Sequence, residues 1–215
     1  MSKLKTTALA LMVALTGTAS AGNFVPQILN EQLNWSPVFS NLNLYAKWVG
    51  GDVRGTSAAI GNNLISESQG TIVWLNKQVQ LADVGADLNA KLKGVHGEVD
   101  LQAVGICNNA ALTSSESNYA YGRNDQRCNT LDPYANLNVA AFSVGGDVTL
   151  SAAAIGNNLN IDSVGAFGDF GSFQANASAV YANVNATLVD VGGSVSASAV
   201  AIGNNASITQ RFTKP

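Results

Sequence analysis

The chain has 215 residues, of which 47% are hydrophobic but only 7% aromatic and 12% charged, and its formal net charge is −3. Average soluble domains carry about 25% charged residues, whereas glycine, asparagine, serine and alanine take their place here. Because phosphate binding requires a basic surface, the acidic balance argues against nucleic acid as a partner.

Residues 1–21 are predicted to be a secretory signal peptide. Lys3 and Lys5 form a basic start, residues 8–15 are apolar, and residues 19–21 (Ala-Ser-Ala) form a small-residue cleavage site. The apolar stretch is too short for a membrane-spanning helix, and no second candidate for a transmembrane helix follows. Cleavage would take the formal charge from −3 to −5. The sequence therefore predicts a protein that is secreted to the extracellular space or the outer surface of a bacterium.

Residues 22–40 are less regular and are predicted to form an N-terminal capping segment. They contain Pro26, Trp35 and Pro37, and the other two tryptophans, Trp48 and Trp74, also lie in the first third of the chain. Terminal repeats of stacked proteins commonly carry atypical residues, which favours capping. Docking of the tryptophans onto a partner is the alternative.

One 26-residue block then occurs four times without insertion or deletion, at residues 41–66, 87–112, 136–161 and 183–208. Its marker isoleucines, Ile60, Ile106, Ile155 and Ile202, are 46, 49 and 47 residues apart. A fixed period of this size is typical of a solenoid, a propeller or an array. Repeat proteins of this kind usually act as surfaces or filaments rather than through pockets.

Asparagines and glycines are among the positions that are identical in all four blocks. The asparagines are Asn43, Asn89, Asn138 and Asn185, together with the pairs Asn62 and Asn63, Asn108 and Asn109, Asn157 and Asn158, and Asn204 and Asn205. The glycines are Gly51, Gly97, Gly146 and Gly193. Glycine marks backbone that bends tightly or takes a positive φ, and asparagine tolerates left-handed backbone and caps turns. These positions are therefore predicted to be turns.

The segments between the turns alternate apolar and polar residues with period two, which predicts half-buried β-strands. In the third block the inward set is Leu137, Val139, Ala141, Val148, Leu150, Ala152 and Ala154. Because the inward side chains are mostly small, the facing sheets are expected to pack closely. We predict an all-β fold, a β-solenoid of four repeats of about 47 residues over 41–208, with two strand–turn–strand rungs in each repeat. The alternative is an antiparallel β-hairpin array, sandwich or barrel, since a Gly-Gly turn also closes a hairpin.

The two cysteines fall in and beside residues 114–132, a charged segment that is predicted to be an irregular loop insert. Cys107 replaces a glycine of the other blocks, and Cys128 lies in the insert with Arg123, Asp125 and Arg127. An even number of cysteines in a secreted chain predicts a Cys107–Cys128 disulfide, with two free thiols as the alternative. The polar tail, residues 209–215, is predicted to fray.

Candidate catalytic and metal-binding residues are few, and we expect neither an enzyme nor a cofactor. His96 is the lone histidine and stands where other blocks have a turn glycine, so we interpret it as a solvated turn residue. It is not spaced for metal ligation with either cysteine. Asp52, Glu98 and Asp147 would form an acidic row in a stack. Calcium binding there is an alternative to solvated turn acids, although the calcium-binding nonapeptide spacing is missing.

The alternating strands, the amides near turns and the signal peptide resemble the curlin-type subunits of bacterial functional amyloid, including the curli-like proteins that attach holdfast to the surface of stalked bacteria. The resemblance covers residues 41–208. It implies a strand–turn–strand solenoid that stacks within and between molecules, with the repeated asparagines named above as structural ladders. Residues 198–207 also resemble a head repeat of trimeric autotransporter adhesins. Both resemblances imply cell-surface attachment.

The sequence thus predicts a secreted cell-surface fibre subunit, or an anchor protein for an adhesive biofilm matrix. It would act by pairing its open β-edges with itself, as a homo-oligomer or fibre, or with other secreted surface-anchor proteins. One alternative is an extracellular polysaccharide-binding β module that uses the Thr/Ser/Asn face, which makes polysaccharide a further candidate partner. The other is a small outer-membrane β-barrel, which would require aromatic girdles.

Overall fold

The computed structural model describes residues 5–9, 27–117, 119–129, 132–165 and 168–212. These residues form thirteen strands in three sheets. Sheet A contains, in spatial order, β1 (Lys5–Leu9), β4 (Val53–Gln69), β7 (Val99–Ser117), β10 (Val148–Gly165) and β13 (Val195–Arg211). Sheet B contains β11 (Gly168–Asn176), β8 (Ala120–Cys128), β5 (Ile72–Gln80) and β2 (Gln27–Asn34). Sheet C contains β12 (Tyr181–Val191), β9 (Tyr134–Val144), β6 (Val84–Val95) and β3 (Val38–Val49).

Every strand pair is parallel, which confirms the prediction of an all-β solenoid. Ile60 is aligned with Ile106, Ile106 with Ile155, and Ile155 with Ile202. One repeat is therefore one coil, with one strand in each sheet. We number the coils one to four by their sheet A strands, β4, β7, β10 and β13.

The predicted division of each repeat into two strand–turn–strand rungs is wrong. The Asn-Asn pairs, interpreted as turns in the sequence, lie inside the long sheet A strands, as Asn62 and Asn63 do in β4. The buried positions of β4 change there from odd-numbered to even-numbered residues, so the strand bends at the Asn-Asn pair and continues in the same coil. The chain therefore closes one wide coil with three strands.

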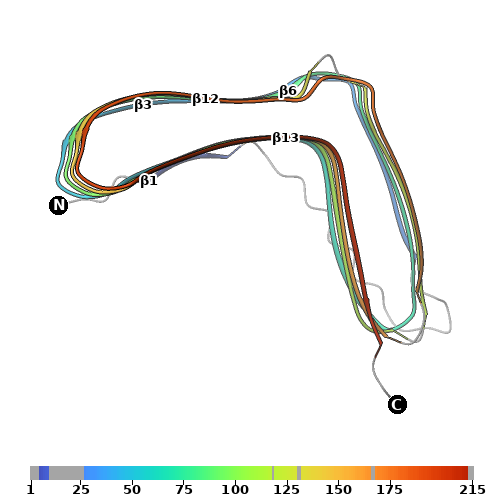
Figure 1. Ribbon diagram of the computed structural model, residues 1–215. Helices are drawn as coiled ribbons and strands as arrows, with labels where there is room; N and C mark the ends of the chain where they lie inside the picture. The colour runs from blue at the N-terminus through green and yellow to red at the C-terminus, as the bar shows by residue number, and fades with distance from the viewer. Residues whose placement is uncertain (1–4, 10–26, 118, 130–131, 166–167, 213–215) are drawn as a thin grey trace.

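The coils stack into an L-shaped cross-section (Figure 1). Sheet A follows the inner side of both arms, sheet C covers one arm, and sheet B covers the other (Figure 1). Each arm has its own apolar core, one between sheet C and the first half of sheet A and the other between sheet B and the second half. No helix with the length and apolar character of a membrane span occurs in the described part of the chain.

The predicted inward residues of the third block are all buried. Leu137, Ala141, Ala152 and Ala154 are 0% exposed, and Val139, Val148 and Leu150 are at most 5% exposed. Their alternation with polar residues in β9 and β10 places one face of each strand in the core of the first arm. Small side chains here let the two sheets approach closely.

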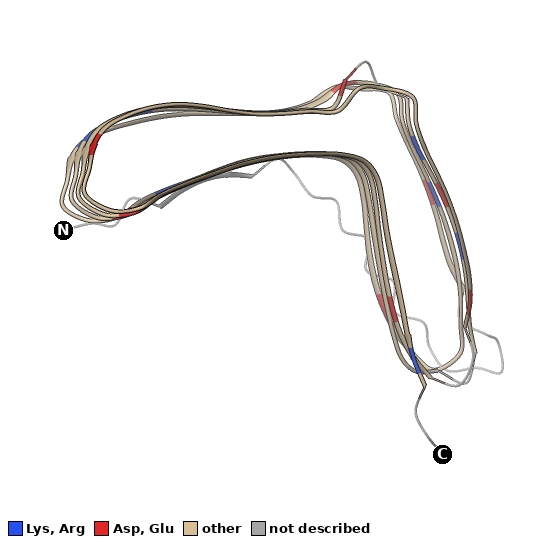
Figure 2. Cartoon of the chain, in the orientation of Figure 1, with Lys and Arg blue, Asp and Glu red and all other residues tan. Residues whose placement is uncertain are grey.

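The predicted loop insert, residues 114–132, contains the regular strand β8, which pairs with β5 and β11. Its burial alternates, with Tyr121, Arg123 and Asp125 on the outer face and Gln126 and Cys128 inside. The prediction differs from the structure because the inward residues of β8 are mainly polar or glycine, so the period of two has no apolar signature. The charged residues of this arm are visible in Figure 2.

The ends of the chain also join the sheets. Of the segment predicted as an N-terminal cap, residues 27–34 form β2, which pairs with β5 as an ordinary strand of sheet B. The predicted tail begins inside β13, which continues to Arg211. Lys5–Leu9, within the predicted signal peptide, form β1 beside residues 54–58 of β4. The predicted cleavage site at residues 19–21 lies outside the described residues.

Left-handed backbone occurs at one equivalent position in all four coils, near the end of each sheet C strand. The residues and their φ angles are Trp48 (57°), Gly94 (66°), Ser143 (57°) and Asp190 (60°). None is a repeat glycine of the turns. Gly97, Gly146 and Gly193 are instead required by close packing, because a Cβ on any of them would collide with the turn backbone of the preceding coil.

Candidate functional site: amide ladders and open ends

The first residue of each Asn-Asn pair forms a buried ladder along the inner bend. The Nδ2 of Asn62 donates to Oδ1 of Asn108 (2.8 Å), Asn108 donates to Asn157 (2.7 Å), and Asn157 donates to Asn204 (2.7 Å). Asn108 and Asn157 are fully buried. Because a buried amide without partners is costly, each rung constrains the register of the next.

The second residue of each pair forms a ladder of opposite polarity. Asn205 donates to Asn158, Asn158 to Asn109, and Asn109 to Asn63, each at 2.7 Å. The Nδ2 of Asn63 is buried and has no hydrogen-bond partner among the described residues. This ladder therefore ends at coil one with an unused donor.

A third ladder follows the outer face of sheet C. The Nδ2 of Asn138 donates to Asn89 (3.0 Å), and Asn89 donates to Asn43 (3.1 Å). Asn185 occupies the equivalent place in β12, aligned with Asn138. The structure thus brings the predicted ladder asparagines into rows along the solenoid axis, two at the inner bend and one on an outer face.

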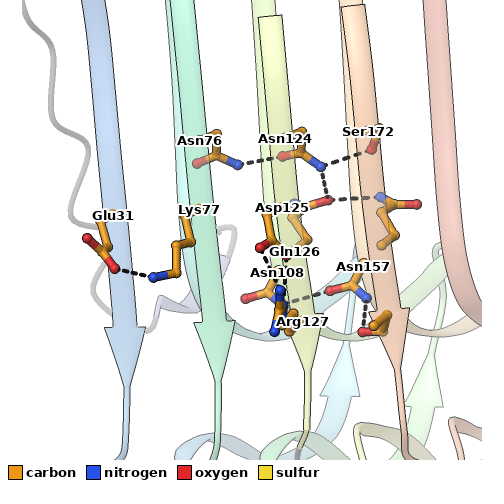
Figure 3. Close-up of polar contacts among 12 residues, drawn as sticks. Glu31, Asn76, Lys77, Asn108, Asn124, Asp125, Gln126, Arg127, Asn157 and Ser172 are labelled. Atoms are coloured by element: carbon orange, nitrogen blue, oxygen red, sulfur yellow. Dashed lines mark hydrogen bonds and ion pairs between the residues drawn. The ribbon is translucent and has the colours of Figure 1, made fainter.

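Sheet B holds two further ladders that the sequence analysis missed. Gln174 donates to Gln126, Gln126 to Gln78 and Gln78 to Gln32, at 2.8 to 3.0 Å. Asn30 donates to Asn76 and Asn76 to Asn124, both at 2.6 Å, and Asn124 donates to Ser172 (3.1 Å). Figure 3 shows part of both rows beside the Asn108–Asn157 rung. One feature of the sequence could have revealed the glutamine ladder. The spacing of Gln32, Gln78, Gln126 and Gln174 is 46, 48 and 48 residues, which is close to the spacing of the marker isoleucines.

The glutamines also tie the two sheets of the second arm together. The Nε2 of Gln78 donates to the backbone carbonyl of Asn109 (3.0 Å), and that of Gln126 donates to the carbonyl of Asn158 (2.9 Å). Both glutamines are fully buried. The core of this arm is therefore partly polar, and its polar groups are paired between coils and between sheets.

The predicted disulfide is present and joins Cys107 of β7 to Cys128 of β8. It joins the middle of β7 to the last residue of β8, a contact between sheets A and B that we call the corner of coil two. In coil one the equivalent residues are Gly61 and Gln80, and in coil three they are Gly156 and Asn176. In both of those coils a Cβ on the glycine would collide with or press against the amide side chain, so the amide fills the space that the disulfide occupies in coil two.

The predicted acidic row lies at the turns between sheets C and A. Asp52 Oδ1 accepts from the backbone N–H of Glu98 (3.1 Å), and Asp147 Oδ1 accepts from the N–H (2.8 Å) and the hydroxyl (2.9 Å) of Ser194. The backbone bond from Ser194, with a second contribution from its hydroxyl, lowers the pKa of Asp147 below its ordinary value. His96 is exposed, and its Nδ1 lies 3.3 Å from the carbonyl oxygen of Val49. The carboxylates of Asp52 and Asp147 therefore accept hydrogen bonds in the turns, whereas that of Glu98 lies 3.8 Å from Arg54.

The C-terminal end of the solenoid is open. Ala152 and Ala154 of coil three are fully buried, whereas their aligned partners in coil four, Ala199 and Ala201, are exposed. Val195, aligned with the buried Val148, is 52% exposed. At the other end β2 and β3 pair on one side only within the described residues, and β4 is covered over residues 54–58 by β1.

Comparison with known proteins gives one family. The family described as holdfast attachment protein D matches residues 3–211, which is nearly the whole chain. No curated protein and no solved structure matches this chain.

Proposed function

We propose, because this chain belongs to the holdfast attachment protein D family, that it is a non-enzymatic anchor subunit that acts by coil-on-coil assembly. Membership of the family gives it a role in adhesion at the cell surface. On our proposal the chain is secreted with a cleaved signal peptide. Its open coils then pair with a second copy, or with another secreted surface-anchor protein, to join adhesive matrix to the cell.

The observation that carries the proposal is the exposed inner face of coil four. Ala199 and Ala201 face the same side as buried residues of the preceding coil, yet nothing in the described chain covers them. The N–H and C=O groups along the outer edge of β13 have no strand partner there either. An unpaired parallel edge beside an uncovered apolar row is a template for a further strand.

The polarity of the amide ladders supports a head-to-tail stack. If coil four of one molecule met coil one of the next, Asn205 of the first would lie opposite Asn63 of the second. The unused Nδ2 donor of Asn63 would then meet an amide oxygen. The ladder through Asn62 and Asn204 has the opposite direction and would continue in the same stack. A single relative orientation thus continues both rows.

The test introduces a charge at a position that is exposed in the single molecule and would become buried only on assembly. In the isolated molecule Ala199 is exposed and Val200, its outward-facing neighbour, is 43% exposed. We expect Ala199→Glu to fold normally but to raise the concentration needed for assembly about 100-fold, because an unpaired carboxylate would enter the stacked core at a cost of a few kcal/mol. Val200→Glu, one residue away on the outer face, is the matched control and should assemble nearly as the unaltered protein does.

Assembly of the secreted protein would be followed by light scattering and electron microscopy, and folding by circular dichroism. Equal assembly of the two variants would overturn coil-on-coil stacking. Unaltered protein that stays monomeric alone and in the presence of the other secreted surface proteins of its host would overturn the proposal as a whole.

A further inference from the structure

Three lysines on one face of the molecule lack the ion pairs that the other described cations have. Arg54, Lys77, Arg123, Arg127 and Arg211 each lie within 4 Å of a carboxylate. Among residues whose side chains the structure describes, the remaining basic side chains are Lys47, Lys91 and Lys93, which make no ion pair with a described residue. All three lie on the outer face of sheet C, in β3 and β6.

The arrangement of these lysines is unfavourable in the protein alone. Lys47 and Lys93 are aligned on neighbouring parallel strands, where strands are about 4.8 Å apart. Like charges placed directly opposite each other destabilise a sheet. The strands of sheet C carry two carboxylates, Asp87 and Asp190. Asp87 accepts hydrogen bonds from Tyr134 and Asn136, both at 3.1 Å, and Asp190 lies in the terminal coil.

An open groove of about 490 Å³ runs beside the lysines and along the solenoid axis. Its lining includes the outer asparagine ladder, Asn43, Asn89, Asn138 and Asn185, together with Tyr45 and Lys91. Tyr45 is 72% exposed and is aligned with Lys91 on the neighbouring strand. The groove thus combines amide groups, an exposed aromatic ring and positive charge, and it crosses all four coils.

We propose that this groove binds a strand of acidic polysaccharide laid along the solenoid axis. Amide groups donate to and accept from hydroxyl groups, an exposed tyrosine offers an apolar ring beside a polar edge, and the lysines would neutralise carboxylates of the polymer. The asparagines recur once per coil, so the groove offers a repeating set of contacts that suits a linear polymer better than a compact molecule. The inference does not depend on assembly of the coils.

The test measures binding of polygalacturonate by the purified protein, with fully methyl-esterified polygalacturonate as the uncharged probe of the same backbone. We expect binding of the acidic polymer only, and a loss of about tenfold in affinity when Lys47, Lys91 and Lys93 are all changed to glutamine, since three exposed charges together contribute on the order of 1–2 kcal/mol. Lys77→Gln on sheet B is the control and should bind normally. Tyr45→Ala should weaken binding without altering its dependence on salt.

Equal binding of the esterified and acidic polymers would overturn the role of the lysines. An absence of polygalacturonate binding, or binding that survives the triple lysine change, would overturn the proposal. Tighter binding of poly-glutamate than of polygalacturonate would assign the lysines to an acidic protein partner instead and would equally overturn it. None of these results depends on whether Ala199→Glu blocks assembly, so the two proposals fail separately.

Discussion

Buried amide side chains in the second arm of the solenoid, such as the fully buried Gln78 and Gln126, need hydrogen-bond partners from the protein. Gln126 has four: it donates to Gln78 and to the carbonyl of Asn158, and it accepts from Gln174 (2.8 Å) and Asn124 (3.2 Å). A buried polar group that loses its partner costs about 1–3 kcal/mol. The satisfied ladder therefore contributes to the register of the coils as well as to stability, since a slip of one residue would separate all four partners.

Replacement of Gln126 by leucine is expected to lower the free energy of unfolding by about 3 kcal/mol or more, because it leaves several buried polar groups unpaired at once. Chemical denaturation of the oxidised protein would measure the loss. Gln102→Leu is the control: Gln102 lies on the exposed face of β7, and its side chain contacts Asp100 only at 3.5 Å. A loss for Gln126→Leu no larger than that for the control would show that the ladder does not stabilise the fold.

At the scale of the element, the corner between sheets A and B occurs in coils one, two and three, and its space is filled in two different ways. In coils one and three an amide lies over a glycine and closes the turn, with Gln80 donating to the carbonyl of Ala82 and Asn176 to that of Ser178, both at 2.8 Å. In coil two the Cys107–Cys128 disulfide occupies this place. A cross-link that closes a loop of this size stabilises a protein by about 3 kcal/mol.

The glycine–amide pair of coils one and three should be able to replace the disulfide of coil two. We expect the double variant Cys107→Gly/Cys128→Gln, which copies Gly61 and Gln80 of coil one, to lose the contribution of the cross-link but to keep the corner packed. Cys107→Ser/Cys128→Ser should be less stable, because it leaves a void and two buried hydroxyls. Unfolding free energies of the two variants and of the unaltered protein would rank them. A serine variant as stable as the glycine–glutamine variant would contradict the equivalence of the corners.

The strands that could be predicted from the sequence are those whose inward-facing residues are apolar, as in β9 and β10. Leu137, Leu150 and their neighbours alternate with polar residues, and period two is then visible as hydrophobicity. Strand β8 of sheet B was missed because Gln126 and Asn124 point inward while Tyr121 and Arg123 point outward, which reverses the usual polarity of a buried face. A polar residue can be buried when an identical residue one coil away forms a hydrogen bond with it. The two residues meet only in the register of the stacked coils, which a single strand sequence does not reveal.

The coil path was mispredicted for a related reason. An Asn-Asn pair that follows a glycine, as in three of the four blocks, has the composition of a turn. Here it forms a bend in a continuous strand because the ladders through Asn62 and Asn63 hold both amides in line. The left-handed position was not recognisable either, since the equivalent residues Trp48, Gly94, Ser143 and Asp190 share no side-chain chemistry. The backbone of the coil dictates φ there, at a cost of about 1 kcal/mol for a residue other than glycine.

At the scale of the whole molecule, the solenoid has two ends that differ in how they are covered. β13 is uncovered, whereas β1 occupies the edge of β4 over residues 54–58. Thr7 of β1 is aligned with Thr56, and in a head-to-tail stack the residue opposite Thr56 would be Ser198 of the neighbouring molecule, because Thr56, Gln102, Ser151 and Ser198 share one coil position. β1 therefore lies where an incoming β13 would bind. If the predicted signal peptide is removed, β1 is removed with it, and we infer that cleavage opens this end for assembly.

This register can be tested by cross-linking. A chain carrying both Thr56→Cys and Ser198→Cys would place the two new thiols on neighbouring strands of adjacent molecules, about 4.8 Å apart along the sheet, which is within reach of a disulfide. We expect the secreted form to give a ladder of covalent oligomers on non-reducing electrophoresis, and the uncleaved chain, with β1 in place, to give few.

The matched control pairs Ser198→Cys with Ala58→Cys, which is displaced by two residues on the same strand and face and so should cross-link poorly. Equal cross-linking of the two pairs would reject this register, and efficient cross-linking of the uncleaved chain would reject the blocking role of β1, because the same edge cannot hold β1 and a neighbouring β13 together.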